Sequence, residues 1–167
     1  MIDEADVWKR FTRLLPTAAA AEVQVCWDIG EQEAGLDVLA GALLAHQVPL
    51  SETTRVEISV VAETWGEREA VAARLLACPG DGRPTVLQLV EGPDTVPLTG
   101  AQLADLVLIP WVRCTASGRL LVRAHAEEPW GLSLNPEHYA VLASEQGPIL
   151  RIFDSSAAWE ALQELMP

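Results

Sequence analysis

The side chains most able to support metal-assisted chemistry, histidines and carboxylates, gather in one short segment of the chain. If His125-x-Glu127 lies on an extended strand, both side chains point to one face, because neighbouring side chains in a strand alternate. Glu128, Glu137 and His138 follow, and such a set can hold a divalent metal that activates water. The spacing matches no zinc-binding pattern, and two prolines indicate a loop. Hydrogen-bonded surface residues are therefore the preferred interpretation, and a small metal-dependent hydrolase is kept as an alternative.

A second candidate metal ligand is Cys114, which opens the pattern Cys114-x-x-Ser117-Gly118. A zinc knuckle has a second cysteine where Ser117 stands, and structural zinc takes its thiolates in such pairs. The other cysteines, Cys26 and Cys78, are distant in sequence, and an odd, sparse set argues against disulfides and for a reducing compartment. The pattern predicts a tight hairpin turn that derives from a zinc knuckle and no longer binds zinc. No metal and no cofactor are predicted.

Motifs for phosphate binding and for nucleophilic catalysis are missing from the sequence. Gly80-Asp81-Gly82 lacks the Lys-Ser/Thr pair of a P-loop, and there is no Gly-x-Ser-x-Gly motif. The basic residues Arg113, Arg119 and Arg123 lie together on a predicted hairpin. We interpret them as pairing with the acidic C-terminal segment, in preference to an anion or RNA site, because stacking aromatics are few. The chain is therefore expected to be non-catalytic.

The charge of the chain restricts its class of partner. It has 11 Lys and Arg against 24 Asp and Glu, which gives a net charge of −13. Because phosphate binding needs clustered cations, we expect no direct nucleic-acid binding and no binding to an anionic membrane. Opposite charge speeds association, so a basic protein is the expected partner. An acidic start and short apolar runs predict no signal peptide, no membrane span and a cytoplasmic location.

Much of the negative charge lies between Asp28 and Glu69, where nine carboxylates accompany two arginines for a net −7. Residues 124–167 form a second acidic segment of net −6, and either segment is a candidate contact surface. A solvated surface that keeps the protein soluble is the alternative interpretation. The predicted partner-binding residues are the carboxylates Glu31, Glu33, Asp37, Glu52, Glu63 and Glu67 and the tryptophans Trp65 and Trp130.

Two features of these carboxylates favour a basic partner. Glu33 and Asp37 are spaced i, i+4, as are Glu63 and Glu67, and like charges at that spacing destabilise an isolated helix by about 0.2–0.5 kcal/mol. A basic partner would remove that repulsion. Glu52 lies three helical turns before Glu63 on nearly one face, so the set can imitate the phosphate charges that a nuclease binds.

These residues must be positioned by an N-terminal set of helices. Hydrophobic periodicity predicts helices over about residues 3–15, 17–29, 31–46, 51–65 and 67–77. Asp3 and Ser51 are predicted N-caps, and Pro16 and Pro49 end the preceding helices. The segment 55–61 also alternates like a strand, and the start signal around Ser51 favours the helix.

The second half of the chain predicts strands. Residues 78–84, rich in Pro and Gly, are a predicted linker. Strands are predicted over residues 85–90, 107–114, 119–125, 139–143 and 149–153, which include two hairpins. A helical turn is expected from Thr99 to Ala104, and a last helix capped by Ser155 or Ser156. The predicted fold is α+β: a helical, bundle-like subdomain over 1–77 and a small antiparallel sheet with a terminal helix over 85–167.

The segment from Ile29 to Trp65 resembles a known family. Gly30-Glu31-x-Glu33, the leucines that follow on one face, and Pro49-Leu50-Ser51 opening another helix are similar to MafI-like immunity proteins of contact-dependent and polymorphic toxin systems. The resemblance implies a cytosolic, non-catalytic bacterial protein that neutralises a toxin domain, often a nuclease, by direct binding. The favoured function is therefore an immunity protein that acts as a toxin inhibitor. The alternative is a cytosolic regulatory or adaptor protein.

Overall fold

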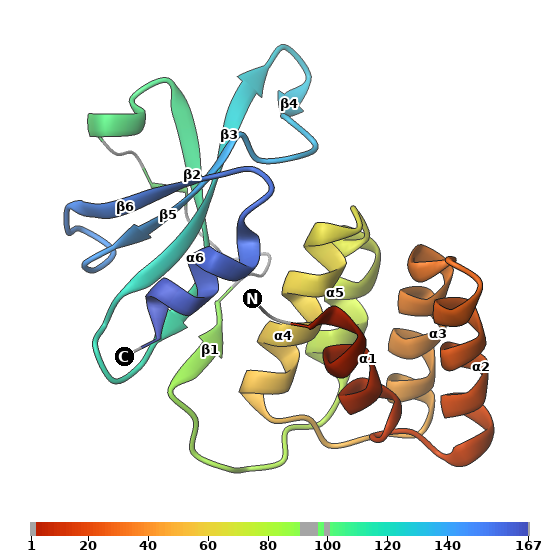
Figure 1. Cartoon of the computed structure of the whole chain (residues 1–167). Coiled ribbons are helices and arrows are strands. Elements are labelled where there is room, and N and C mark those ends of the chain that lie inside the picture. The colour runs from red at the N-terminus through yellow and green to blue at the C-terminus, as the bar shows by residue number, and fades with distance from the viewer. Residues whose placement is uncertain (1–2, 91–96, 99–100, 167) are drawn as a thin grey trace. The chain divides into compact units, whose positions relative to one another are not determined.

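The computed structural model of the chain describes residues 3–90, 97–98 and 101–166. The chain divides into two units, Met1–Arg83 and Pro84–Pro167 (Figure 1). The first is helical and the second contains an antiparallel sheet and a terminal helix, which confirms the predicted α+β fold. Within the predicted linker, the backbones of Pro79 and Asp81 bond to both polar groups of Leu50, at 2.8 and 3.0 Å. This segment is therefore tied to the first unit.

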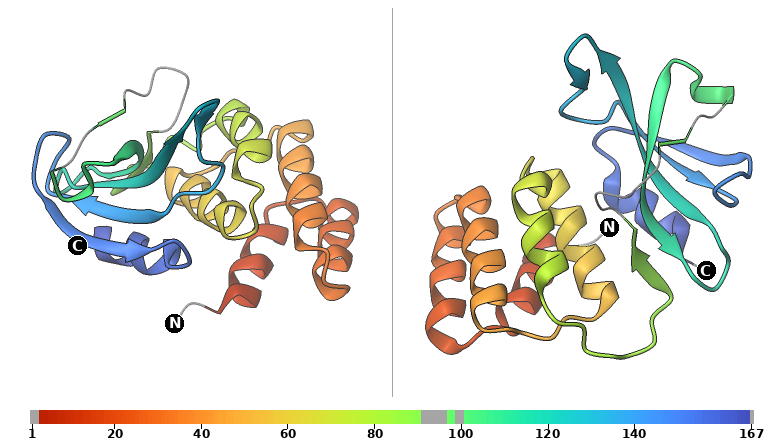
Figure 2. Two further views of the ribbon diagram at one scale, coloured as in Figure 1. Left: turned by 90° about the horizontal axis from the view of Figure 1, so that it is seen from above. Right: turned by 180° about the vertical axis from the view of Figure 1, so that it is seen from behind.

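The described part of the first unit consists of helices that pack side by side (Figure 2). Their bounds are α1 (Glu4–Thr12), α2 (Thr17–Asp28), α3 (Gln32–Ala45), α4 (Glu52–Thr64) and α5 (Arg68–Ala77). The contacts run in the order α1, α2, α3, α5 and α4, so α3 lies between α2 and α5. Each helix corresponds to one that the sequence predicts.

The sequence signals that begin these helices work as expected. The Asp3 side chain accepts a hydrogen bond from the backbone of Ala5 at 3.0 Å, and Ser51 accepts one from Thr54 at 3.0 Å. Segment 55–61 is helical, as predicted. Val56, Ile58, Val60 and Val61 are all fully buried, and most of the circumference of α4 is therefore covered. That burial explains why its sequence also alternates like a strand.

The described residues of the second unit form a six-stranded antiparallel sheet. Its elements are β1 (Leu87–Leu89), η1 (Ala101–Leu103), β2 (Leu106–Cys114), β3 (Leu120–Glu128), β4 (Gly131–Leu132), β5 (His138–Leu142), β6 (Ile149–Asp154) and α6 (Ala158–Leu165). The strand order is β1-β2-β3-β5-β6, with β4 paired to β3. The two predicted hairpins are present. The start of the predicted helical turn, Thr99, lies outside the described residues.

The β3–β4 hairpin was not predicted. Strand β3 runs three residues beyond the expected end at His125, and Glu127 and Glu128 pair with Leu132 and Gly131 of β4. The two-residue β4 has no periodic pattern of its own, so the sequence gives no strand signal there.

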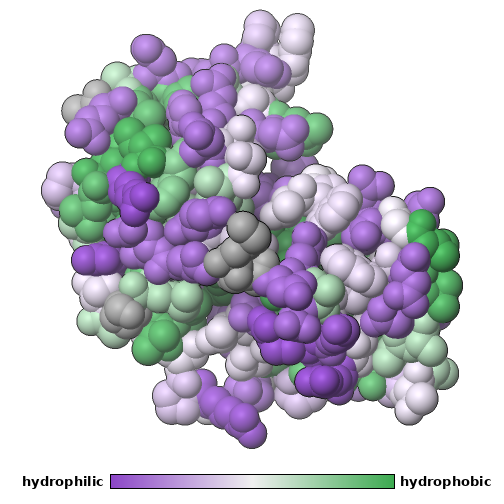
Figure 3. Space-filling view, viewed as in Figure 1, coloured by the Kyte–Doolittle hydropathy of each residue, from purple (hydrophilic) through white to green (hydrophobic). Residues whose placement is uncertain are grey.

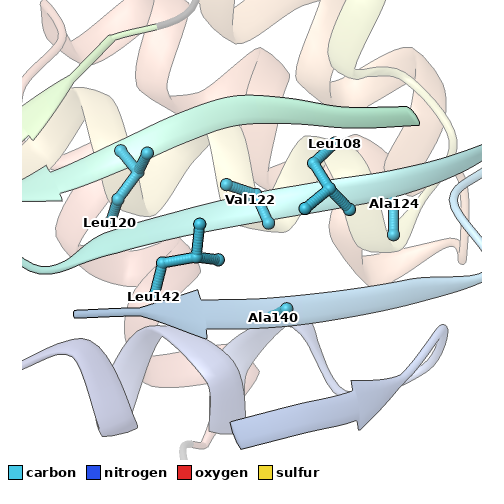
Figure 4. Packing of buried hydrophobic residues seen from close by; sticks show 6 residues of the cluster. All are labelled: Leu108, Leu120, Val122, Ala124, Ala140 and Leu142. Carbon is cyan, nitrogen blue, oxygen red and sulfur yellow. The ribbon is translucent and has the colours of Figure 1, made fainter. Parts of the chain in front are cut away.

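Both faces of the central strands β2, β3 and β5 are largely buried. One face carries an apolar cluster from β2, β3 and β5, shown in Figure 4: Leu108, Leu120, Val122, Ala124, Ala140 and Leu142. Arg151 lies opposite Val141 in the register, and its guanidinium is 2.7 Å from the Glu164 carboxylate of α6. Because Val141 alternates with Ala140 and Leu142, α6 covers the opposite face.

The start of α6 differs from the prediction. Its N-cap position is Ala157, which makes no side-chain capping bond, so neither Ser155 nor Ser156 caps the helix. After β6 the backbone N–H of Ala157 bonds to the carbonyl of Asp154 at 3.0 Å. This turn delays the helix past both serines. Among the described residues, no helix has the length and apolarity that a membrane crossing requires.

Candidate functional site

The two arginines of the acidic segment are enclosed by the helical unit. Arg68 Nε lies 2.9 Å from the Glu63 carboxylate, and the two side chains are only 13% and 8% exposed. Arg55 is buried and lies 3.1 Å from a Glu52 oxygen, and it donates hydrogen bonds to the carbonyls of Leu75 and Cys78. Glu52 and Glu63 therefore neutralise arginines that hold α4 and α5 together. They lie outside the candidate contact surface.

The predicted like-charge pair of Glu63 and Glu67 does not share a helix. Helix α4 ends at Thr64, and Gly66 follows with a φ of +74°, a backbone conformation that favours glycine. Glu67 then lies at the N-cap of α5 and is partly exposed. The i, i+4 repulsion expected between Glu63 and Glu67 is therefore not a feature of this fold.

Asp37 lies on the exposed side of α3 and is also paired. Its carboxylate is 2.7 Å from Arg74 Nη2, and Arg74 donates a second bond to the Asp37 carbonyl at 3.0 Å. The carboxylate remains two-thirds exposed, at 67%. Because exposed pairs are weak, Asp37 stays available to a stronger cationic partner.

Three carboxylates that lack a cation among the described residues lie where α2 turns into α3. Glu31 and Glu33 are exposed, and neither forms an ion pair with a described residue. Exposed Asp28 accepts only a neutral bond, from Gln24 at 2.8 Å. These three carboxylates, together with the neighbouring Val25 and Ile29 of α2, are called the acidic corner below.

The acidic corner is held by a defined helix ending. The N–H of Glu31 bonds to the Cys26 carbonyl at 2.8 Å, and that of Gly30 to the Trp27 carbonyl at 3.1 Å. Gly30 has a φ of +84°, so the ending has the pattern of a Schellman motif. Glu31 and Glu33 then begin α3, where the helix dipole stabilises negative charge.

The acidic corner also exposes apolar side chains. Val25 and Ile29 are 56% and 67% exposed and, at i, i+4, lie on one side of α2. Figure 3 shows apolar surface along the outer edge of this helix beside hydrophilic atoms. Sequence reasoning missed both residues, although their spacing next to acidic residues was a usable signal. An apolar centre with a charged rim is typical of a protein-binding surface.

The two tryptophans predicted as contacts have different surroundings. Trp65 is half-buried and donates its indole N–H to Glu4, so it is engaged within the helical unit. Trp130, at the turn after β3, is 86% exposed, and its indole N–H lies 3.2 Å from a Glu128 oxygen. Of the two, Trp130 is the one accessible to a partner.

The histidine and carboxylate cluster does not converge on a metal site. His138 lies opposite Ala124 in the sheet register, so its side chain and that of His125 project from opposite faces. His125 is buried, and its Nδ1 is 2.8 Å from the carbonyl of Ser133. No three His, Cys, Asp or Glu side chains in the described ranges, which include the whole predicted cluster, are placed to hold a metal. The hydrolase alternative therefore lacks the ligand set on which it was based.

Cys114 ends β2 in the predicted tight turn. The thiol accepts hydrogen bonds from the Ser117 hydroxyl and from the backbone N–H groups of Ser117 and Ala116. Burial alone would raise the pKa of Cys114, but these hydrogen bonds and the charge of Arg119 outweigh it, and the pKa is lowered. Ser117 thus donates to the sulfur at the position where a zinc knuckle has its second thiolate.

The basic residues of the β2–β3 hairpin contact other groups of the second unit. Arg113 forms an ion pair with Glu145, and Arg119 donates to the carbonyl of Glu164 at 3.4 Å. Arg123 is buried, with its guanidinium 5.5 Å from the centre of the Trp111 ring. For Arg113, the charge pairing with the acidic C-terminal segment follows the prediction, whereas Arg119 bonds to a backbone carbonyl of that segment. Arg123 does not belong to a surface patch.

Comparisons of the chain with protein-family models, with curated proteins and with solved structures gave no match. The proposed function therefore rests on the surfaces of the molecule itself. Two of them combine exposed apolar side chains with carboxylates that lack a cation among the described residues. These are the acidic corner, with Glu31 and Glu33, and the β3–β4 hairpin, with Trp130.

Proposed function

We propose that the protein is a non-catalytic binding protein, an immunity protein that neutralises a basic bacterial toxin domain by direct contact. The observation that carries the proposal is the acidic corner. There the exposed carboxylates Asp28, Glu31 and Glu33 are close in the chain to the exposed Val25 and Ile29. The net charge of −13 and the resemblance of residues 29–65 to MafI-like proteins support the same conclusion.

The physical basis of the proposal is complementarity to a cationic site. A nuclease domain must present Lys and Arg to the phosphates of its substrate. Carboxylates spaced along the α2–α3 turn can occupy those cations and keep the substrate away. Charge mainly accelerates and selects the encounter. Burial of Val25 and Ile29 supplies affinity, since full burial of such side chains is worth about 1.5–3 kcal/mol each.

The test is rescue of cells that express the candidate toxin. The candidate is a basic C-terminal domain of a secreted protein encoded immediately upstream of this chain. Wild-type protein is expected to restore growth and to bind the purified domain with an affinity that falls as salt rises. The double variant Glu31→Lys, Glu33→Lys is expected to lose rescue and most of that salt dependence.

Glu160→Lys is the matched control for this experiment. Glu160 is exposed in the first turn of α6, as Glu33 is in α3, so Glu160→Lys removes the kind of helix-dipole stabilisation that Glu33→Lys removes. The control is expected to rescue growth like wild type. Rescue by the double variant, with unchanged affinity and salt slope, would exclude the acidic corner. High affinity for a basic cytosolic protein, with no rescue from the toxin, would instead favour the adaptor alternative.

A further inference from the structure

The β3–β4 hairpin also exposes apolar side chains that are close together in the chain. Residues 127–137, called the acidic hairpin below, extend β3 beyond the body of the sheet (Figures 1 and 2). Trp130 and Leu134 are 86% and 77% exposed, and Leu132 between them is exposed as well. Single exposed apolar residues are common, but three within five positions form a patch that indicates an interaction site.

The base of the acidic hairpin is densely hydrogen-bonded. Ser133 donates its N–H to the Ala126 carbonyl at 2.8 Å, and its hydroxyl accepts from the Ala126 N–H at 3.1 Å. The same hydroxyl donates to the Asn135 carbonyl at 2.9 Å. The Ser133 carbonyl in turn contacts the buried ring of His125. A loop fixed in this way loses little conformational entropy when a partner binds.

The charge of the acidic hairpin has one sign. Glu127, Glu128 and Glu137 are exposed, and none forms an ion pair with a described residue. The hairpin contains no Lys or Arg. Its Trp130 ring is exposed, and the face of an indole ring attracts a guanidinium or ammonium group. A complementary surface therefore has an apolar pocket with a rim of Lys and Arg.

We propose that the acidic hairpin is a plug, which inserts Trp130 and Leu134 into an apolar pocket at the cationic cleft of a basic protein. This inference rests on the proposed function, because the basic protein is the toxin domain bound by the immunity protein. Trp130 is the anchor, Leu134 widens the contact, and Glu127 and Glu128 meet cations at the rim. A projecting element suits a concave site, so the plug closes the cleft to substrate.

The experiment measures the dissociation constant between full-length protein and the purified toxin domain encoded beside it. Trp130→Ala is expected to weaken binding at least thirtyfold, roughly the effect of removing an interface hot spot. Leu134→Ser is expected to weaken it several-fold, and Trp130→Phe to retain most of the affinity. Leu150→Ser is the control, because Leu150 is exposed on β6 outside the hairpin, and its affinity should equal that of wild type.

The outcomes separate this inference from the proposed function. Tight binding by wild type with no loss in Trp130→Ala or Leu134→Ser would overturn the plug and leave the immunity function standing. Absence of binding by wild type would overturn both. Because Trp130 and Leu134 are exposed, their variants should keep the circular dichroism spectrum and melting temperature of wild type. Loss of affinity in variants with unchanged melting temperature would therefore support the plug.

Discussion

Gly35 is the position in α3 where helix packing leaves no room for a side chain. A Cβ atom there would lie 2.7 Å from a ring carbon of Trp8 and 3.1 Å from the Cβ of Cys26. Trp8 is buried and packs against Trp27, with ring centres 5.2 Å apart, so it has little freedom to move. We expect Gly35→Ala to lower the free energy of unfolding by about 1–3 kcal/mol in urea titrations.

Gly41 is the control in the same helix. A Cβ there would meet only Arg74 Nη1, at the ordinary contact distance of 3.6 Å. Alanine is the better helix former, so Gly41→Ala should raise the free energy of unfolding by about 0.5–1 kcal/mol. Equal effects of the two substitutions would contradict the close packing at Gly35.

The buried cysteines should give opposite dependences of stability on pH. Burial raises the pKa of Cys78 above its ordinary value of 9.0, and Arg55 lowers it by less. The contribution of the Cys78 thiol to the free energy of unfolding is therefore complete below about pH 9. It is lost as the pH rises through the pKa of the thiol in the folded protein. The pKa of Cys114 is lowered, so its thiolate contributes fully above about pH 9, and that contribution is lost as pH falls through the folded pKa.

The measurement compares Cys78→Ala and Cys114→Ala with wild type in urea titrations between about pH 7.5 and 10. The stability difference between wild type and Cys78→Ala should shrink as pH rises, because the thiol of wild type must ionise in a buried site. The difference for Cys114→Ala should grow. Each variant is the control for the other, and differences with the same pH trend would show that the hydrogen bonds to Cys114 do not favour its thiolate.

At the scale of elements, the ion pair between Glu63 and Arg68 joins the end of α4 to the start of α5. Both side chains are largely buried, so Glu63→Gln removes the enclosed charged partner of Arg68, whose other carboxylate neighbour is the exposed Glu69 at 3.4 Å. We expect a loss of roughly 1–3 kcal/mol in the free energy of unfolding. Asp37→Asn is the control, because its pair with Arg74 is exposed and should contribute less than about 1 kcal/mol.

The elements that the sequence predicted are those with a local signal. Helix α4 could be predicted from Pro49 and the Ser51 cap. Its hydrophobic periodicity was a weak signal, because side chains are buried around most of the helix. The predicted N-cap of α6 was wrong because Ser155 and Ser156 lie in a turn that the Ala157 N–H closes onto the Asp154 carbonyl, before the helix begins. The β3–β4 hairpin was missed because β4 is too short to show alternation.

The candidate contact residues show what local sequence cannot predict. Trp65 and Trp130 stand in nearly the same pattern, glutamate two residues before and glycine directly after. Trp65 is half-buried because Glu4, 61 positions away, accepts its indole N–H, whereas Trp130 bonds to its own hairpin and is exposed. Likewise, whether a glutamate neutralises a buried arginine depends on how α5 folds back on α4. Such partners are set by tertiary packing.

At the scale of the whole molecule, the excess of 24 acidic over 11 basic residues should make the protein more stable in salt. Like charges repel one another in the folded state, and the screening length falls to about 10 Å at 0.1 M salt. Salt also weakens exposed ion pairs such as Arg10–Glu57 and Arg151–Glu164, but such pairs contribute only about 0–1 kcal/mol each. The repulsion of the unpaired carboxylates should therefore dominate.

The melting temperature is expected to rise by a few degrees as NaCl increases from about 20 to 300 mM, since 1 kcal/mol corresponds to about 2–4 °C for a chain of this size. The variant Glu127→Gln, Glu128→Gln removes two neighbouring charges that stabilise no helix end, and it should melt higher at low salt with a smaller salt slope. A melting temperature that falls with salt in wild type would mean that ion pairs outweigh repulsion. In that case the carboxylates without cations would not destabilise the fold, and a basic partner would have no repulsion to remove.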